Sequence, residues 1–263
     1  MKTLKISLIV CASVFLLSNC KDEPINIFTL QDDIALGKQL KEEIASDPAT
    51  YPILDETLYP EAYQHLRRIR DSLLATGKVN YKDSFAWEVY IINQDVLNAF
   101  AAPGGYLYFY TGLIKFLDNE AQFAGVLGHE MAHAARRHST SQLTKAYGIS
   151  VLLSVLVGED PGLLSQIAAS LLILKFSRTH EDDADAHAVQ YLYATHYDAR
   201  GVAGFFEKLQ AADSTGSVEV PFLSTHPSDE HRIERIYTEW TTLGGKEGTY
   251  DSLSFAAFKA SLP

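Results

Sequence analysis

Residues 118–138 read DNEAQFAGVLGHEMAHAARRH, and this stretch decides how the rest of the chain is interpreted. Its first two residues, Asp118 and Asn119, are both favourable helix N-caps, because their side chains can accept hydrogen bonds from free backbone amides. Apolar residues then recur every four positions, at Phe123, Leu127 and Met131. This spacing is typical of a helix with one buried face, so the sequence predicts a helix that runs to about His138.

The predicted helix contains a His-Glu-x-x-His motif at residues 129–133. Helical spacing places His129 and His133 one turn apart on the same face, so both imidazoles can reach one metal ion. Glu130 lies about 100° round the helix from His129, where it can face a water on that ion without ligating it. Imidazole ligands with a position left open suit a catalytic zinc. The motif alone is also compatible with two surface histidines on an amphipathic helix.

The segment 180–185, His-Glu-Asp-Asp-Ala-Asp, offers the best candidate for a third ligand. Glu181 and Asp185 are four residues apart and would share one face of a helix. A carboxylate at Glu181 would complete a His-His-Glu set. Asp185 could then accept a hydrogen bond from a ligating imidazole and fix its tautomer. Four acids among five residues are also typical of a solvated helix face, so the segment alone does not decide between the two interpretations.

Short motifs elsewhere in the chain accompany these two segments in a characteristic order. They are Asn98-Ala99-Phe100, Pro103-Gly104-Gly105, Thr111-Gly112-Leu113, Ser177-Arg178 and Thr225-His226-Pro227-Ser228. With H-E-x-x-H and E-x-x-A-D, this order resembles one peptidase family, the CaaX prenyl proteases and their soluble bacterial relatives in envelope quality control, which are gluzincins. The chain lacks the several membrane spans of the prenyl proteases, so it is more similar to the soluble branch. The resemblance extends over about residues 30 to 240.

The resemblance implies one zinc ion per chain, bound by His129, His133 and Glu181, with Glu130 as the catalytic base. His226 is then the best candidate in the sequence for a donor to the developing oxyanion. Similarity to regulated family members gives His226 a second possible role, that of a fourth zinc ligand which holds the enzyme closed. Capping or core packing is a third possibility for this residue.

Two further groups of residues are assigned less specific roles. Arg178 is expected to pair with Asp185 or a neighbouring acid and brace the second helix, or else to form a plain surface salt bridge. The other histidines are expected at the surface or at helix ends, with His180 and His187 as second-choice ligands. They are His65, His138, His180, His187, His196 and His231.

The fold predicted from these patterns is α+β and mainly α-helical, a zincin-like metallopeptidase domain with a small sheet. Residues 86–92 and 105–110 are rich in β-branched and aromatic residues and predict strands. The segment 98–110 could form an edge strand that binds extended peptide, with Gly104 and Gly105 allowing close backbone approach. Helices are expected around 31–77, 179–195, 199–212 and 228–240, with a buried helical hairpin at 149–157 and 163–176.

The N-terminal sequence, MKTLKISLIVCASVFLLSNC, predicts export. Two lysines precede an apolar run that is short for a membrane span, as in a secretion signal. Residues 17–20 resemble a bacterial lipobox, which implies acylation of Cys20. The charged residues that follow resemble the export signal of some surface lipoproteins, and they are equally compatible with a solvated linker. We therefore expect a signal peptide at 1–19, a lipid-anchored tether at 20–30, a metallopeptidase domain at 31–240 and a C-terminal tail at 241–263.

The amino-acid composition of the chain limits the kinds of molecule that it can be expected to bind. The chain has 263 residues, of which 47% are apolar and 21% charged, and a formal charge of −11, which is ordinary for a globular protein. An acidic chain is a poor partner for nucleic acid or for anionic lipid, because both require clustered Lys and Arg. We expect protein or peptide substrates, no nucleic acid, and membrane attachment only through the N-terminal lipid. The expected location is the outer membrane, facing the periplasm or the cell surface.

Three functions are compatible with these features. The first is an endopeptidase of the cell envelope that cleaves misfolded or unassembled proteins through a zinc-activated water and a glutamate base. The second is a zinc-binding chaperone without turnover, against which the intact Glu130 argues. The third is a structural zinc protein, which a chelator would unfold.

Overall fold

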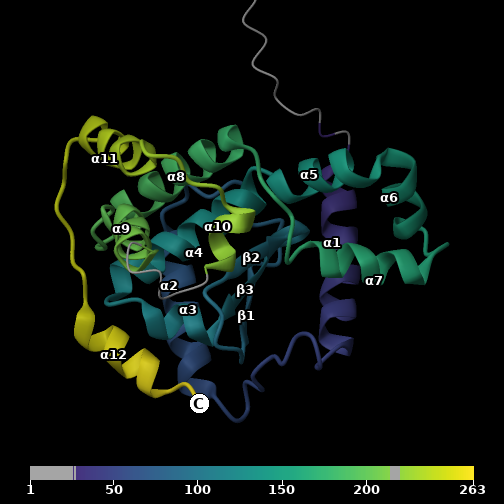
Figure 1. Cartoon of the computed structure of the whole chain (residues 1–263), viewed down its shortest axis with the longest axis horizontal. Helices are drawn as coiled ribbons and strands as arrows, with labels where there is room; N and C mark the ends of the chain where they lie inside the picture. Colours follow the sequence, from purple (N-terminus) through teal and green to yellow (C-terminus); the bar gives the residue numbers. More distant parts are fainter. Residues whose placement is uncertain (1–25, 27, 214–219) are drawn as a thin grey trace, which may run out of the picture.

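The computed structural model describes residue 26 and the ranges 28–213 and 220–263. The predicted signal peptide and the predicted lipidation site Cys20 lie outside the described residues. Helices surround a small sheet (Figure 1), which confirms the predicted α+β, mainly helical fold. The elements are α1 Leu30–Ser46, α2 Pro60–Ala75, β1 Glu88–Ile92, β2 Ala99–Ala102, β3 Tyr106–Tyr110, α3 Thr111–Phe116, α4 Glu120–Ala135, α5 His138–Tyr147, α6 Ile149–Leu156, α7 Pro161–Ser170, α8 Arg178–Tyr193, α9 Gly201–Asp213, α10 Pro221–Thr225, α11 Arg232–Thr242 and α12 Ser252–Ala260.

The sheet has three strands in the order β1-β3-β2. β1 runs parallel to β3, with Val89 opposite Leu107. β2 runs antiparallel to β3, with Phe100 opposite Tyr108. The strands predicted at 86–92 and 105–110 are therefore confirmed. The prediction of one edge strand over 98–110 is wrong, because this segment folds back on itself: β2 lies at an edge of the sheet, whereas β3 is its central strand.

Alternation along β3 divides the interior into two apolar clusters, because successive side chains of a strand point to opposite faces. Leu107 and Phe109 join the main core, which contains the buried faces of α2, α4, α8 and α9. Tyr106, Tyr108 and Tyr110 join the second cluster, with the buried residues of α1, α6 and α7. The predicted GYLYFY strand is thus buried on both faces.

Close backbone packing fixes the turn between β2 and β3. Gly104 takes φ +75°, a conformation that favours glycine. Across from this turn, Gly37 of α1 lies so near that a Cβ placed on it would be 2.0 Å from the carbonyl oxygen of Pro103. A side chain at residue 37 would therefore push α1 away from the sheet.

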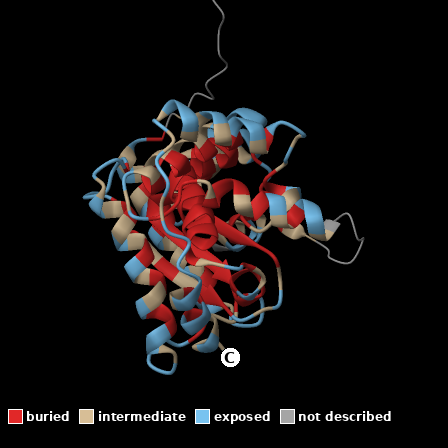
Figure 2. Cartoon of the chain, turned by 90° about the vertical axis from the view of Figure 1, so that its left-hand side faces the viewer, coloured by how far each residue is buried: buried red, intermediate tan, exposed pale blue. Residues whose placement is uncertain are grey.

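Helix α4 is the centre of the molecule, and all of its residues are buried. Figure 2 shows this helix within the buried interior. Gly125 lets α9 approach closely, since a Cβ there would lie 2.8 Å from the Cα atom of Val202. The Asn119 side chain caps the helix by accepting from the amide of Gln122 at 3.0 Å, as the sequence predicts.

The predicted helix to His138 is wrong at its end, because α4 stops at Ala135. Arg137 takes the left-handed φ of +61° and separates α4 from α5. Its guanidinium forms an ion pair with the buried Asp33 of α1 and donates to the carbonyl oxygen of Thr29 at 3.0 Å. This tertiary interaction with the N-terminal segment overrides the helical pattern.

The hairpin formed by α6 and α7 is only partly buried, contrary to expectation. Leu152 and Val155 of α6 point into the second apolar cluster. The opposite face of α6 and the turn after α7 are open, with exposed fractions of 41% for Ile149, 48% for Leu153, 71% for Val157 and 75% for Ile173. None of the helices in the described part of the chain combines the length and the apolar character that a membrane span requires.

The expected C-terminal tail contains an ordered element, α12. Phe255 and Phe258 of this helix are fully buried in the main core, with ring centroids 6.0 and 5.4 Å from the ring of Phe123. Arg68 of α2 donates to the Ser254 hydroxyl at 2.9 Å. The segment after residue 240 is therefore packed against the domain that carries the site.

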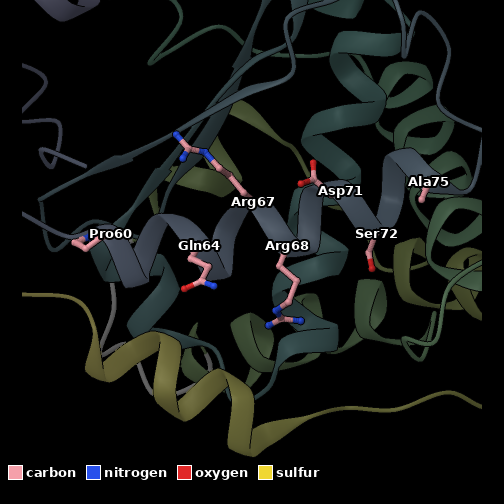
Figure 3. Close-up of a pocket in the computed structure, with 7 residues that line it drawn as sticks. All are labelled: Pro60, Gln64, Arg67, Arg68, Asp71, Ser72 and Ala75. Carbon is pink, nitrogen blue, oxygen red and sulfur yellow. The ribbon is translucent and has the colours of Figure 1, made fainter. Parts of the chain in front are cut away.

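A surface hollow runs along α2 on this side of the molecule (Figure 3). Its lining residues are Pro60, Gln64, Arg67, Arg68, Asp71, Ser72 and Ala75. Arg67 and Arg68 point to opposite sides of the helix (Figure 3). Arg67 pairs with the exposed Glu56, while Arg68 pairs with the buried Glu120.

Candidate metal centre

Three of the predicted site residues lie on α4. His129 and His133 are one helical turn apart, and Glu130 lies between them. Each of the three side chains is at most 2% exposed. This burial excludes the interpretation of the motif as two surface histidines on an amphipathic helix.

Glu181 comes from α8, which packs along α4. The side chain of Ser177 caps this helix by accepting from the amide of His180 at 3.2 Å. The carboxylate of Glu181 is 2% exposed and points to the His129–His133 face of α4. The acidic segment is therefore not simply a solvated helix face.

His226 directly follows α10 and is 1% exposed. The amide of Phe222 donates to the carbonyl of Leu97 at 3.1 Å, and the amide of Phe176 donates to the carbonyl of Thr225 at 3.0 Å. These bonds tie α10 to the segment before β2 and to the segment before α8. The His226 ring stacks on Phe222 at 4.2 Å, with the planes inclined by 16°.

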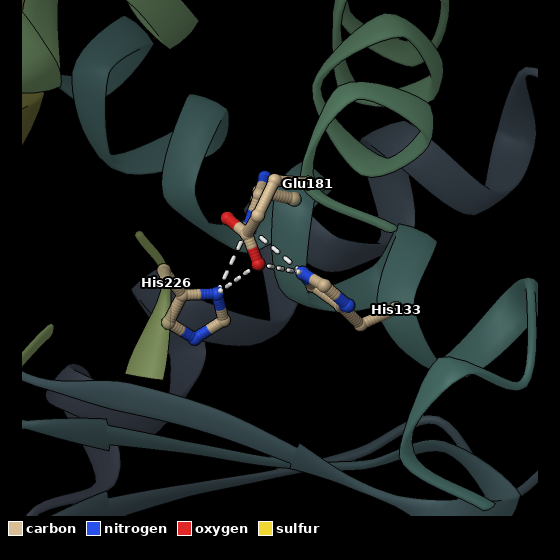
Figure 4. A group of neighbouring side chains, drawn as sticks. His133, Glu181 and His226 are labelled. Carbon is tan, nitrogen blue, oxygen red and sulfur yellow. Dashed lines mark hydrogen bonds and ion pairs between the residues drawn. The ribbon is translucent and has the colours of Figure 1, made fainter. Parts of the chain in front are cut away.

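The four side chains converge on one point, with one ligand atom of each lying within 4.8 Å of all the others. His129 Nε2 is 3.0 Å from His133 Nε2 and 3.3 Å from His226 Nδ1. Glu181 Oε1 is 3.2 Å from His226 Nδ1 and 3.4 Å from His133 Nε2. Figure 4 shows His133, Glu181 and His226 pointing toward one another from α4, α8 and the end of α10.

These distances fit a single zinc ion. Ligands about 2.0–2.1 Å from a tetrahedral centre lie roughly 3.3 Å from one another. Five of the six ligand pairs have atoms 3.0 to 3.5 Å apart, close to that edge length, and the whole set lies within 4.8 Å. The donor set of three imidazoles and one carboxylate is also one that zinc prefers.

The balance of buried charge points the same way. With neutral imidazoles, Glu130, Glu181 and Asp185 carry three negative charges, and Arg232 supplies one positive charge; all four side chains are buried. Unpaired buried charge is costly. A divalent cation at the convergence point would balance the set.

Asp185 and Arg232 contact the candidate ligands without being ligands themselves. His129 Nδ1 lies 2.8 Å from Asp185 Oδ1, so the imidazole and the carboxylate are a buried ion pair, and Asp185 lies beside His129 as the sequence predicts. Arg232 of α11 pairs with Asp185 at 2.7 Å and with Glu181 at 2.9 Å. The pairing of Arg178 with Asp185 is wrong, because Arg178 is exposed at the start of α8 and Arg232 occupies that place.

The protonation states suit metal binding. Burial opposes ionisation of Glu181, but its interactions with His226, His129 and His133 hold its pKa well below the ordinary value. Burial lowers the pKa of His133, so this imidazole is neutral. Burial also lowers that of His129, but Asp185 and Glu181 outweigh it and raise the pKa of His129 to about 9. Zinc binding must therefore displace a proton from His129.

Glu130 lies at the edge of the group and is free to act on a substrate. Among the described residues, neither of its carboxylate oxygens has a hydrogen-bond partner. Its nearest ionisable partner is His226, whose Nε2 lies 3.5 Å from Glu130 Oε1. Burial raises the pKa of Glu130, as suits a group that accepts and then releases a proton near neutral pH.

The other candidates do not belong to the group of converging side chains. Gly104 and Gly105 lie against the chain itself, where added Cβ atoms would be 3.2 Å from the Asp33 carbonyl and 3.0 Å from the Trp87 amide. Their small size is therefore explained by internal packing. The second-choice ligands His180 and His187 are not among the converging side chains.

Comparisons with known proteins agree with this geometry. The profile described as "Peptidase family M48" matches residues 60–239. The chain is 34% identical over 185 residues to the mitochondrial metalloendopeptidase OMA1 of Arabidopsis thaliana, covering 69% of this chain and 37% of that protein. It is 32% identical over 157 residues to OMA1 of Schizosaccharomyces pombe, covering 59% and 46% respectively. It is 28% identical over 221 residues to the beta-barrel assembly-enhancing protease of Yersinia pestis, covering 78% and 43%. The chain thus spans less than half the length of each of these relatives.

Proposed function

The chain belongs to peptidase family M48 and is a metalloprotease, and on this premise we propose that it is a zinc-dependent endopeptidase of the bacterial cell envelope. The observation that carries the proposal is the convergence of His129, His133 and Glu181 on one point with Glu130 beside it. The proposed substrates are misfolded or unassembled envelope proteins. The bacterial relatives named for beta-barrel assembly support this substrate class.

In the proposed reaction, each residue of the site has a separate role. His129, His133 and Glu181 would hold the zinc, which when bound polarises a scissile carbonyl and lowers the pKa of a water. The Glu130 carboxylate accepts a proton from the attacking water and passes it to the nitrogen of the leaving amine. Asp185, beside His129 Nδ1, would keep Nε2 of His129 available for the zinc, and Arg232 pairs with Asp185.

We propose that His226 is a fourth ligand in the state seen here, and that this state is closed. Its Nδ1 atom lies 3.3 Å from His129 Nε2 and 3.2 Å from Glu181 Oε1, within the ligand set. A fourth protein ligand would occupy the position that a catalytic zinc site keeps open. Release of His226 would then be needed before a substrate carbonyl can approach.

The location is a separate proposal, supported by the N-terminal sequence. The chain would be exported, cleaved before Cys20, acylated there, and tethered to the outer membrane. Treatment with globomycin, or the substitution Cys20→Ala, should change the electrophoretic mobility of the protein and release it from membranes. Unchanged mobility and membrane association in both tests would exclude this anchor. The peptidase proposal does not depend on the outcome.

A degradation assay tests the enzymatic proposal. Purified protein should fragment casein, and chelation or Glu130→Gln should stop the reaction while Glu130→Gln retains its zinc. A wild-type protein that binds zinc and suppresses aggregation but never cleaves casein, even with His226→Ala, would favour the chaperone interpretation. If chelation unfolds the protein instead, the zinc is structural.

A further inference from the structure

The ligand His133 makes a hydrogen bond on the side away from the metal group. Its Nε2 atom belongs to the converging set, while its Nδ1 atom lies 3.1 Å from Nδ1 of His138. When two imidazole nitrogens meet at this distance, one donates and the other accepts. A metal ligand needs its Nε2 lone pair, so Nδ1 of His133 carries the hydrogen and donates it. His138 Nδ1 is therefore the acceptor.

This assignment also fixes the tautomer of His138. If its Nδ1 accepts, its hydrogen resides on Nε2, which lies 3.2 Å from Asp183 Oδ2. The same carboxylate oxygen accepts from Arg136 Nε at 2.7 Å. A hydrogen bond and an ion pair thus lead from His133 through His138 to Asp183.

The position of His138 is held by packing. It is the first residue of α5 and is 6% exposed. Its ring stacks on the ring of His180, with centroids 4.3 Å apart and planes inclined by 14°. Within the described part of the chain, neither nitrogen of His180 has a hydrogen-bond partner. His180 therefore acts on His138 through stacking alone.

We propose that His138 is a positioning residue of the metal centre, which holds His133 in the tautomer and orientation needed to bind zinc. The inference rests on the proposed function, because it assigns His133 to a zinc ligand set. Each α4 histidine then has its own acidic partner: His129 forms an ion pair with Asp185, and His133 reaches Asp183 through His138. Loss of such a supporting partner typically weakens metal binding by about 10- to 100-fold.

Zinc affinity, measured by competition with a chromophoric chelator, tests the inference without reference to activity. His138→Phe removes the acceptor and should weaken zinc binding by about 10- to 100-fold. His138→Asn retains an acceptor close to the Nδ1 position and should restore most of the affinity. His180→Phe is the matched control, because it preserves the stacked ring and lacks only nitrogens that make no hydrogen bond.

A spectroscopic measurement covers the case in which His138→Phe does not fold. Nitrogen NMR of zinc-loaded wild-type protein with ¹⁵N-labelled histidine should show His138 as the Nε2–H tautomer with an unprotonated Nδ1. The Nδ1–H tautomer would overturn the inference, as would a folded His138→Phe protein that binds zinc as tightly as wild type. A wild-type protein that binds no zinc would overturn the proposed function as well, so the two failures are distinguishable.

Discussion

Arg232 Nη2 lies 2.9 Å from Glu181 Oε2, and both side chains are almost completely buried. The same guanidinium pairs with Asp185 at 2.7 Å and lies over the Phe206 ring at 3.8 Å from its centroid. One residue of α11 therefore contacts both Glu181, a proposed metal ligand, and Asp185, the carboxylate beside the proposed ligand His129. This ion-pair cluster joins α8 to α11 next to the candidate metal site.

Replacing Arg232 by Met should strongly destabilise the protein, because it leaves two buried carboxylates without their counter-charge. Breaking a buried ion pair costs about 3–5 kcal/mol, which urea denaturation of metal-free protein would measure. Arg235→Met is the matched control on the same helix, since its guanidinium is 41% exposed and pairs with Asp182 and Asp229. Arg235→Met should lower the free energy of unfolding by less than about 1 kcal/mol. Equal losses for the two variants would contradict the role of Arg232.

Replacing Glu130 by Gln should reduce casein cleavage by about 10²- to 10⁴-fold, the usual contribution of a general base. Because Glu130 does not belong to the ligand set, zinc content should stay unchanged. Glu159→Gln, at an exposed glutamate after α6, is the control. Glu130→Gln protein that cleaves at the wild-type rate would remove Glu130 from the mechanism.

Replacing His226 by Ala should raise the rate of cleavage if the residue closes the site as a fourth ligand. It should also weaken zinc binding, because one ligand of four is lost. A lower rate with unchanged zinc affinity would instead identify His226 as the donor to the oxyanion. His231→Ala serves as the control, since that side chain is 63% exposed and lies five residues further along the chain.

The ion pair between the buried Glu120 and the partly exposed Arg68 should make stability depend on pH. Burial raises the pKa of Glu120, but the hydrogen bonds from Arg68 and Tyr197 outweigh it, so the net shift is downward from 4.5. A lowered folded-state pKa contributes stability above the ordinary value, and this contribution is lost as the pH falls through the folded-state pKa.

Arg68→Met should therefore lower the free energy of unfolding by about 2 kcal/mol at pH 7. This value lies between those for exposed and buried ion pairs, because the Arg68 side chain is 41% exposed. The difference from wild type should shrink as the pH is lowered below 4.5. Arg67→Met, whose partner Glu56 is exposed, should show neither effect. A loss for Arg68→Met that is independent of pH would refute the electrostatic explanation.

The sequence predicts the parts of the site that depend on local spacing. His129 and His133 lie four residues apart in one helix, so periodicity alone places them together. Glu181 is assigned through the resemblance of its E-x-x-A-D motif, and the packing of α8 on α4 brings it to the two histidines. The strands at 88–92 and 106–110 are likewise evident from their own residues.

The parts that were missed depend on tertiary packing. Arg232 stands among other charged residues of a helix, and nothing in its neighbourhood distinguishes it from the exposed Arg235. His138 is expected at the surface or at a helix end, and it is indeed the first residue of α5, but contact with His133 and His180 buries it. The partial exposure of α6 could not be predicted for the same reason. An apolar run does not indicate which of its faces packs against the rest of the protein.

The most direct measurement is an anomalous difference map from a crystal of the protein, recorded at the zinc absorption edge. We expect a single zinc peak per chain, about 2.0–2.2 Å from Nε2 of His129, Nε2 of His133 and a carboxylate oxygen of Glu181. The peak should vanish in Glu181→Ala protein grown under the same conditions. A zinc-saturated crystal with no peak at this position, or with its zinc bound elsewhere, would contradict the metal centre on which the assigned chemistry depends.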